Sequence, residues 1–217
     1  MLLKLSHRSS CAYVVMALLS LTATAKHASA TVIYDNVTAG SGAISGGTAG
    51  VAIAPTAHGP LGDSFSTGST ATTLTDLKLL LEDTTPSDGG TFKVGLYSNN
   101  SNSPGTLIAT LGTFNDSLLT ASLTPFDITT SDALAANTRY WIEVTGTTTS
   151  NAGWSFDTTN VGTGVASEYN FYNGGVSANN SFTPYQMEVV VSPEPVSWSL
   201  MVAVSGVVAV ILKRRRS

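Results

Sequence analysis

Few residues of this 217-residue chain have side chains suited to catalysis or to binding transition metals. Cysteine occurs once, as Cys11, and His58 is the one histidine beyond residue 30. Next to His58, Gly59 and Pro60 predict an exposed loop, and no Gly-x-Ser-x-Gly sequence accompanies any serine. Beyond residue 30 the sequence therefore excludes thiol catalysis and zinc–thiolate sites, and it disfavours a Ser–His–acid catalytic triad.

Carboxylates are the other candidates for chemistry. Residues 31–192 contain 13 of them, spread along the chain, so no pair stands out as the two acids of a glycan hydrolase. Glu82, Asp83 and Asp88 flank a Thr-Thr-Pro-Ser turn and offer oxygen ligands that suit calcium. No Asp-x-Asp-x-Asp-Gly loop is present, so the alternative is that these acids only form and solubilise the turn. No phosphate-binding or dinucleotide-binding fingerprint occurs, and we expect no cofactor.

Aromatic residues concentrate late in the chain, between residues 140 and 185. Because an exposed aromatic ring can stack on a sugar ring, Trp141 and Trp154 are candidate glycan-binding residues. The alternative is that aromatic side chains at this spacing form cross-strand pairs in a core. Threonine is abundant, but it does not recur at a regular spacing, which disfavours an ice-binding face.

Short runs that alternate apolar and polar residues, separated by Gly, Pro, Asn, Asp and Ser, predict the strands that position these side chains. In Thr91–Tyr97 the side chains at 92, 94 and 96 face inward, and in Thr138–Thr145 those at 140, 142 and 144 do so while Trp141 faces outward. We expect one turn of helix within residues 127–137. Further strands are predicted at Thr31–Tyr34, Val51–Ala54, Asp63–Thr67, Leu74–Leu81, Leu107–Leu111, Leu118–Leu123, Gly153–Asp157, Glu168–Tyr172 and Tyr185–Val191.

Nine to eleven short strands at this spacing predict an all-β fold for residues 31–192. The expected architecture is an antiparallel β-sandwich, jelly-roll-like in its connections. This stretch is long enough to bury about 70% of the surface of its unfolded chain, so it can fold without disulfides.

Residues 1–30 predict a secretory signal peptide. Lys4 and Arg8 precede a short apolar core at residues 12–21, and Ala28 and Ala30 supply the small side chains that signal peptidase requires. The apolar core is about ten residues long, half of what a membrane span needs. We expect cleavage after Ala30 and export through the inner membrane.

Residues 193–217 predict a membrane-anchoring segment. Pro193-Glu194-Pro195 predicts an extended, exposed stretch, because two prolines disfavour both a helix and a ladder. Residues 196–212 form a 17-residue run without charge, about 26 Å long as a transmembrane helix. Trp198 suits the outer membrane interface, where an amphipathic ring is favoured. The run is followed by four cations, which are favoured on the cytoplasmic side: Lys213, Arg214, Arg215 and Arg216.

This order of Pro-Glu-Pro, apolar span and basic tail resembles the PEP-CTERM sorting signal, whose C-terminal domain is also labelled by its occurrence on ice-binding proteins. In that family an inner-membrane enzyme, exosortase, recognises and processes the tail, and the Gram-negative bacteria concerned make exopolysaccharide. The resemblance implies a sorting motif at Pro193, Glu194 and Pro195, an exosortase-like partner, and delivery to the cell surface or medium. Ser192 stands where the family often has Val.

Residues 92–107 resemble bacterial surface domains of the choice-of-anchor kind. In these domains a strand ending in Leu-Tyr precedes an Asn-rich turn and Pro-Gly, here Leu96-Tyr97, Asn99-Asn100 and Pro104-Gly105. The segment from Trp141 to Val144 fits the later strand of that pattern. The resemblance implies a β ectodomain that occurs with interchangeable anchors, and it implies no particular molecular activity.

Charge is segregated along the chain. The overall charge of −4 averages cationic ends with an acidic centre, because residues 31–192 hold three cations against 13 acids, a net charge of −10. Such a domain would not bind nucleic acid by charge, and binding to an acidic exopolysaccharide would need bridging cations. We expect a non-enzymatic surface or matrix protein associated with exopolysaccharide or biofilm. The alternatives are a carbohydrate-binding module using exposed aromatics, a glycan hydrolase and an ice-binding protein.

Overall fold

The structure, a computed structural model, describes residues 29–37, 51–54, 58–157, 161–172, 175–178 and 184–194. Several predicted features lie outside the described residues: Ala28 with most of the signal peptide, Pro195, the apolar run 196–212 with Trp198, and the basic tail 213–216. Within the described ranges, no helix has the length and apolar character that a membrane span requires.

Twelve β-strands make up most of the described chain, in which no α-helix occurs, so the all-β prediction is confirmed. The strands are β1 (Thr31–Asp35), β2 (Val51–Ala52), β3 (Leu61–Ser66), β4 (Thr72–Asp83), β5 (Thr91–Asn100), β6 (Ser103–Asn115), β7 (Thr124–Leu134), β8 (Arg139–Gly146), β9 (Ala152–Trp154), β10 (Tyr169–Tyr172), β11 (Gly175–Ala178) and β12 (Met187–Pro193). A 3-10 turn, η2 (Asp116–Leu118), follows β6.

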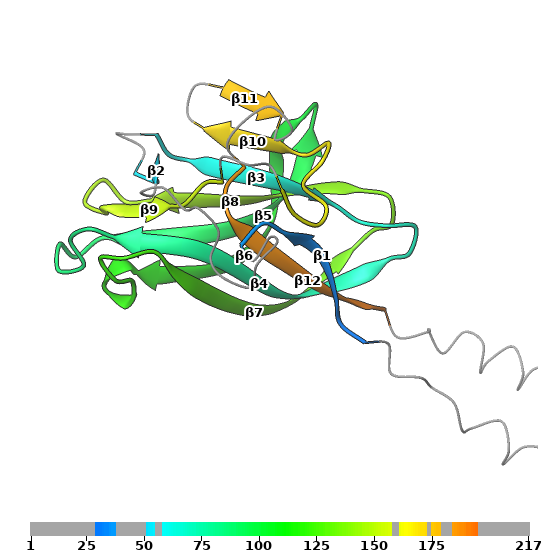
Figure 1. The fold of residues 1–217 in the computed structure, drawn as a ribbon, viewed down its shortest axis with the longest axis horizontal. Coiled ribbons are helices and arrows are strands. Elements are labelled where there is room, and N and C mark those ends of the chain that lie inside the picture. Colours follow the sequence, from blue (N-terminus) through cyan, green and yellow to red (C-terminus); the bar gives the residue numbers. More distant parts are fainter. Residues whose placement is uncertain are drawn as a thin grey trace, which may run out of the picture.

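The strands form two antiparallel sheets that face each other, so the sandwich predicted from the sequence is confirmed in outline (Figure 1). Sheet A has the order β1-β12-β4-β9-β2, with β7 on the other edge of β4. Sheet B has the order β11-β10-β3-β8-β5-β6. The jelly-roll-like connectivity stays a prediction.

The long strand β4 organises sheet A. Along one edge it pairs with β7, and along the other it pairs first with β12 and then, past Leu79, with β9. Thr72 at its start lies opposite Pro193, and Asp83 at its end lies opposite Ala152. At about 3.3 Å per residue these two ends of β4 are about 35 Å apart. One strand therefore connects the C-terminal end of the domain to its opposite end.

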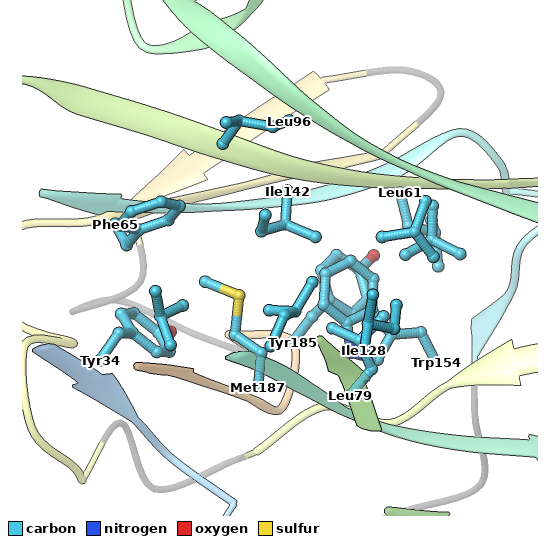
Figure 2. Close-up of a cluster of buried hydrophobic side chains, with 14 of the residues drawn as sticks. Tyr34, Leu61, Phe65, Leu79, Leu96, Ile128, Ile142, Trp154, Tyr185 and Met187 are labelled. Atoms are coloured by element: carbon cyan, nitrogen blue, oxygen red, sulfur yellow. The ribbon is translucent and has the colours of Figure 1, made fainter. Parts of the chain in front are cut away.

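An apolar core fills the space between the sheets (Figure 2). In the close-up, Leu61, Phe65 and Ile142 of sheet B point toward Leu79 and Met187 of sheet A. All of the side chains predicted to face inward are buried: Phe92, Val94, Leu96, Tyr140, Ile142, Val144, Met187, Val189 and Val191.

Two local predictions are wrong. The helical turn expected within residues 127–137 is absent, because residues 124–134 form β7 and pair with β4 along most of its length. This pairing buries Ile128 and Leu134, so tertiary contacts override the local preference. The strand expected at Leu118–Leu123 is instead the end of η2 and an irregular segment, in which Leu119 packs into the core.

We expect Leu79→Ala to lower the free energy of unfolding by about 2–5 kcal/mol, because it leaves a cavity under a fully buried position of β4. Ile108→Ala is the control. Ile108 lies on the edge strand β6 and is 48% exposed, so its truncation should change stability by less than about 0.5 kcal/mol. Urea unfolding measures both values, and equal losses would contradict the placement of Leu79.

Candidate functional site

Three aspartates from separate parts of the sequence meet at one end of the sandwich. Asp83 is the last residue of β4, Asp88 lies in the β4–β5 loop, and Asp116 begins η2 directly after β6. One carboxylate oxygen of each residue lies within 4.8 Å of those of the other two. We call these three residues the aspartate triad.

The triad lies at the end of the sandwich opposite the point where the chain enters and leaves the domain. The register places Thr72, at the other end of β4, beside Pro193. In Figure 1 the β4–β5 loop lies at the left, whereas β1 begins and β12 ends at the right. A ligand bound at the triad would therefore be held away from the C-terminal segment.

Two of the three aspartates have hydrogen-bond partners that hold them in place. The Asp88 carboxylate accepts hydrogen bonds from the Gly90 N–H at 3.0 Å and from the Asn151 side-chain amide at 2.6 Å. Oδ1 of Asp83 accepts a hydrogen bond from the Thr85 N–H at 2.7 Å. These bonds fix the β4–β5 loop and attach it to the loop between β8 and β9.

Three oxygens of the triad are buried without a hydrogen bond from the described residues. They are Oδ2 of Asp83 and both carboxylate oxygens of Asp116, and both residues are 0% exposed. Ser150 and Asp88 lie beside Asp116, but neither makes a hydrogen bond of normal geometry with it. Buried polar atoms are nearly always paired, so three unpaired oxygens in one place call for an explanation.

Burial and like charge both disfavour ionisation of the triad. Burial raises the pKa of Asp116, and the neighbouring Asp88 charge raises it further. Burial also raises the pKa of Asp83, with a smaller contribution from Asp88. The pKa of Asp88 is lowered, mainly by its hydrogen bond from the Gly90 N–H. The donor set is made only of oxygen, which suits a hard cation such as Ca²⁺.

Gly90 leaves the space that allows the elements of the site to approach. A Cβ on Gly90 would lie 2.0 Å from Oδ2 of Asp116 and 2.5 Å from the Ser150 Cα. The backbone N–H of Asp116 also donates to the Gly90 carbonyl at 3.2 Å. Glycine at this position therefore lets η2 and the β8–β9 loop pack against the β4–β5 loop.

The sequence identified part of this site. Of the three predicted calcium ligands, the structure brings Asp83 and Asp88 together but leaves Glu82 out of the triad. Adjacent strand residues point to opposite faces, so Glu82 and Asp83 cannot face the same ion easily. Asp116 was missed because it is distant in the sequence; its only local signal is an acid in the turn after a strand.

The proposed roles of Trp141 and Trp154 as exposed stacking platforms are wrong, because both side chains are 0% exposed. Trp154 lies in the core, where its ring stacks on Tyr185 at 5.0 Å and its indole N–H donates to the Gln186 carbonyl. Trp141 lies on the outer face of sheet B, and its indole N–H donates to Asn99 Oδ1 at 2.9 Å.

Gly62 and Pro104 pack near the Trp141 ring and contribute to its burial. The ring of Trp141 and the ring of Pro104 both lie 3.4 Å from the position that a Cβ on Gly62 would occupy. The β5–β6 hairpin, to which Pro104 belongs, therefore packs near the Trp141 ring on the outer face of the sheet. A Cβ at position 62 would make ordinary van der Waals contacts with both rings, so these residues pack closely together.

The predicted sorting motif begins inside the fold. Pro193 pairs with Thr72 as the last residue of β12, so the expectation that the motif stays out of a ladder is wrong for this residue. Proline is tolerated there because β1 pairs only as far as Val191, which leaves the Pro193 nitrogen without a partner strand on that side. Glu194 is exposed, as predicted, and so are Ala30 and His58.

Comparison with known proteins does not place the chain in a family. No family model and no curated protein matches it. Among solved structures it is similar to one holding the cysteine protease and lectin-like domains of Cwp84, a surface layer associated protein of Clostridium difficile. The TM-score is 0.42 and the identity 12%, and the alignment covers 62% of this chain but only 32% of that one. This match assigns neither an activity nor a ligand.

Gly90→Ala should lower the free energy of unfolding by about 1–3 kcal/mol, because its methyl group would collide with Asp116 and the Ser150 backbone. Gly68→Ala is the matched control, since no atom lies within 4 Å of the added methyl group there. Thermal unfolding of both variants checks this. A Gly90→Ala variant as stable as the Gly68→Ala variant would show that the loops are not closely packed.

Trp154→Ala should lower the free energy of unfolding by about 3–5 kcal/mol, because it removes a fully buried ring that stacks on Tyr185. Replacing Trp141 and Trp198 by Phe leaves Trp154 as the single tryptophan. In the folded state of this variant, iodide should quench its fluorescence only weakly, because the ring is shielded from solvent. Strong quenching in the native state would contradict the burial of Trp154.

Proposed function

We propose that this chain is an exported, non-enzymatic surface protein, which its C-terminal segment directs from the inner membrane to the cell surface or extracellular matrix. The observation that carries the proposal is the order of features at the C-terminus. A Pro-Glu-Pro motif begins where the folded domain ends, and an apolar run and a basic tail follow at residues 196–212 and 213–216. This order resembles the PEP-CTERM sorting signal.

The geometry around Glu194 supports access by a processing enzyme. β12 ends at Pro193, and Glu194 is exposed at the rim of sheet A. Its backbone N–H approaches the Ala71 carbonyl at 3.5 Å, so the chain is still extended at this point. An exosortase-like enzyme would find Glu194 exposed directly next to the domain.

The placement of the two chain ends also fits delivery by a terminal anchor. Thr31 lies opposite Val191 in the β1–β12 pair, so the chain enters and leaves the domain at the same end (Figure 1). The predicted signal peptide and the predicted anchor are therefore joined to the same end of the sandwich. The aspartate triad lies at the opposite end.

Extracellular polysaccharide is the partner class that we propose for the exported domain. The net charge of −10 on residues 31–192 means that an acidic polymer would be repelled unless cations intervene. A carbohydrate-binding module that uses Trp141 and Trp154 is not supported, because both rings are buried. No specific observation favours a glycan hydrolase or an ice-binding protein.

Glu194→Gln should leave the fold intact and block processing, because the residue is exposed and belongs to the motif rather than to the core. We expect the wild-type chain to lose its C-terminal tail and reach the surface or the medium. The variant should remain at full length in the inner-membrane fraction. Cell fractionation with intact-mass analysis of the C-terminus measures both outcomes.

Asp127→Asn controls for the loss of one negative charge, since Asp127 is exposed on β7 and lies outside the motif. This variant should be processed and released like the wild type. Deletion of residues 213–216 should retain the chain as Glu194→Gln does. Normal release of the Glu194→Gln variant would refute the sorting proposal, whatever the ligand of the domain.

A further inference from the structure

We propose that the aspartate triad binds a single Ca²⁺ ion, with Asp83, Asp88 and Asp116 as its protein ligands. Acidic clusters are common on protein surfaces, and the decisive observation here is the burial of unpaired oxygens. Oδ2 of Asp83 and both carboxylate oxygens of Asp116 are buried without a hydrogen bond from the described residues. One oxygen of each triad residue lies in the cluster, so at least one unpaired oxygen, that of Asp116, faces the other two carboxylates. A bound cation would give an oxygen in this position a partner.

The spacing of the oxygens matches the size of Ca²⁺. Calcium binds carboxylate oxygens at about 2.3–2.6 Å, so two ligands on opposite sides of the ion lie up to about 5 Å apart. One oxygen of each triad residue lies within 4.8 Å of those of the other two, which a Ca²⁺ ion can bridge. Mg²⁺ requires a near-ideal octahedron at about 2.0–2.1 Å and gives up its water molecules reluctantly, so a protein cluster of this kind suits it less well.

No ion pair joins a cationic side chain of the described residues to the triad. The ion pairs found there are Lys78 with Glu188 and Arg139 with Glu168. Three carboxylates this close repel one another when ionised, and burial adds the cost of desolvation. A bound cation would offset both costs.

Exposure at one side of the site allows an ion to enter. Asp83 and Asp116 are buried, whereas Asp88 is half-buried in the β4–β5 loop. Calcium takes six to eight oxygen ligands, and water molecules can supply the remaining ones from this exposed side. The hydroxyl of Ser150, which lies beside Asp116, is a further oxygen within the site.

Calcium at this position would join the two sheets. Asp83 ends β4 of sheet A, whereas Asp116 follows β6 of sheet B. Asp88 is hydrogen-bonded to Asn151 in the connection from β8 to β9, which passes from sheet B to sheet A. One ion would thus hold together three connections at the end of the sandwich distant from the anchor.

The test is calorimetric titration of CaCl₂ into the purified full chain after removal of divalent ions with EDTA. We expect a single site with a Kd of about 0.1–1 mM, the range of extracellular calcium modules, and a higher Tm in Ca²⁺ than in EDTA. MgCl₂ should bind more weakly. Absence of both heat and Tm shift, equal binding of Mg²⁺, or an identical Tm shift in KCl of matched ionic strength would each overturn the proposal.

Asp116→Asn separates ion binding from a merely structural role. This variant should bind Ca²⁺ at least about tenfold more weakly, because it loses one of three charged ligands. In EDTA it should be no less stable than the wild type, because its carboxylate accepts no hydrogen bond and repels Asp88. Unchanged affinity in a folded Asp116→Asn variant would refute the assignment.

Two further variants complete the experiment. Asp88→Asn changes a half-buried ligand whose amide can still accept the hydrogen bond from Gly90, so it should fold and also lose affinity. Asp127→Asn, an exposed acid on β7, should keep the wild-type affinity. Equal losses in all variants would show that overall charge, and not the triad, attracts the ion. Because these measurements use purified protein, they do not depend on whether the sorting proposal holds.

Discussion

The hydrogen-bonded pairing of β4 on both of its edges is the constraint on which the rest of the structure depends. β4 pairs with β7 on one side and with β12 and β9 on the other. Leu77, Leu79 and Leu81 bury one face of the strand against sheet B, and Leu80 is buried on the other face. A strand with so few exposed apolar atoms cannot shift its register by one residue without exposing this leucine face. Its ends are therefore fixed, one beside Pro193 and the other beside Ala152.

Those two ends place the predicted sorting motif and the candidate ion site at opposite ends of one small domain. At the start of β4 the register places Thr72 beside Pro193, where the predicted motif begins. At its other end, Asp83 is held where two connections from sheet B arrive with Asp116 and Asn151. The apolar core supplies the stability that allows buried, unpaired carboxylates to be kept close together. Without an ion, that arrangement costs free energy which the core must offset.

Most strands could be predicted because alternation of apolar and polar residues is a local signal. Phe92, Val94 and Leu96 all point inward, as their spacing indicates, and so do Met187, Val189 and Val191. The incorrect predictions concern segments whose structure depends on contacts with residues far away in the sequence. β7 is a strand because β4 offers it a free edge, and Trp141 is buried where Pro104 of the β5–β6 hairpin packs near it. Neither partner is close in the sequence.

The sequence by itself determined the all-β class and the strongly acidic character of residues 31–192, because composition and short-range order carry these properties, and it predicted the export features. It also predicted Asp83 and Asp88 as calcium ligands, because the two acids flank a turn. Only the tertiary structure decided that Asp116 joins them, that Glu82 does not, and that both Trp141 and Trp154 are buried. The physical reason is that side-chain burial and ligand geometry depend on contacts between sheets, and these contacts join residues that no local pattern relates.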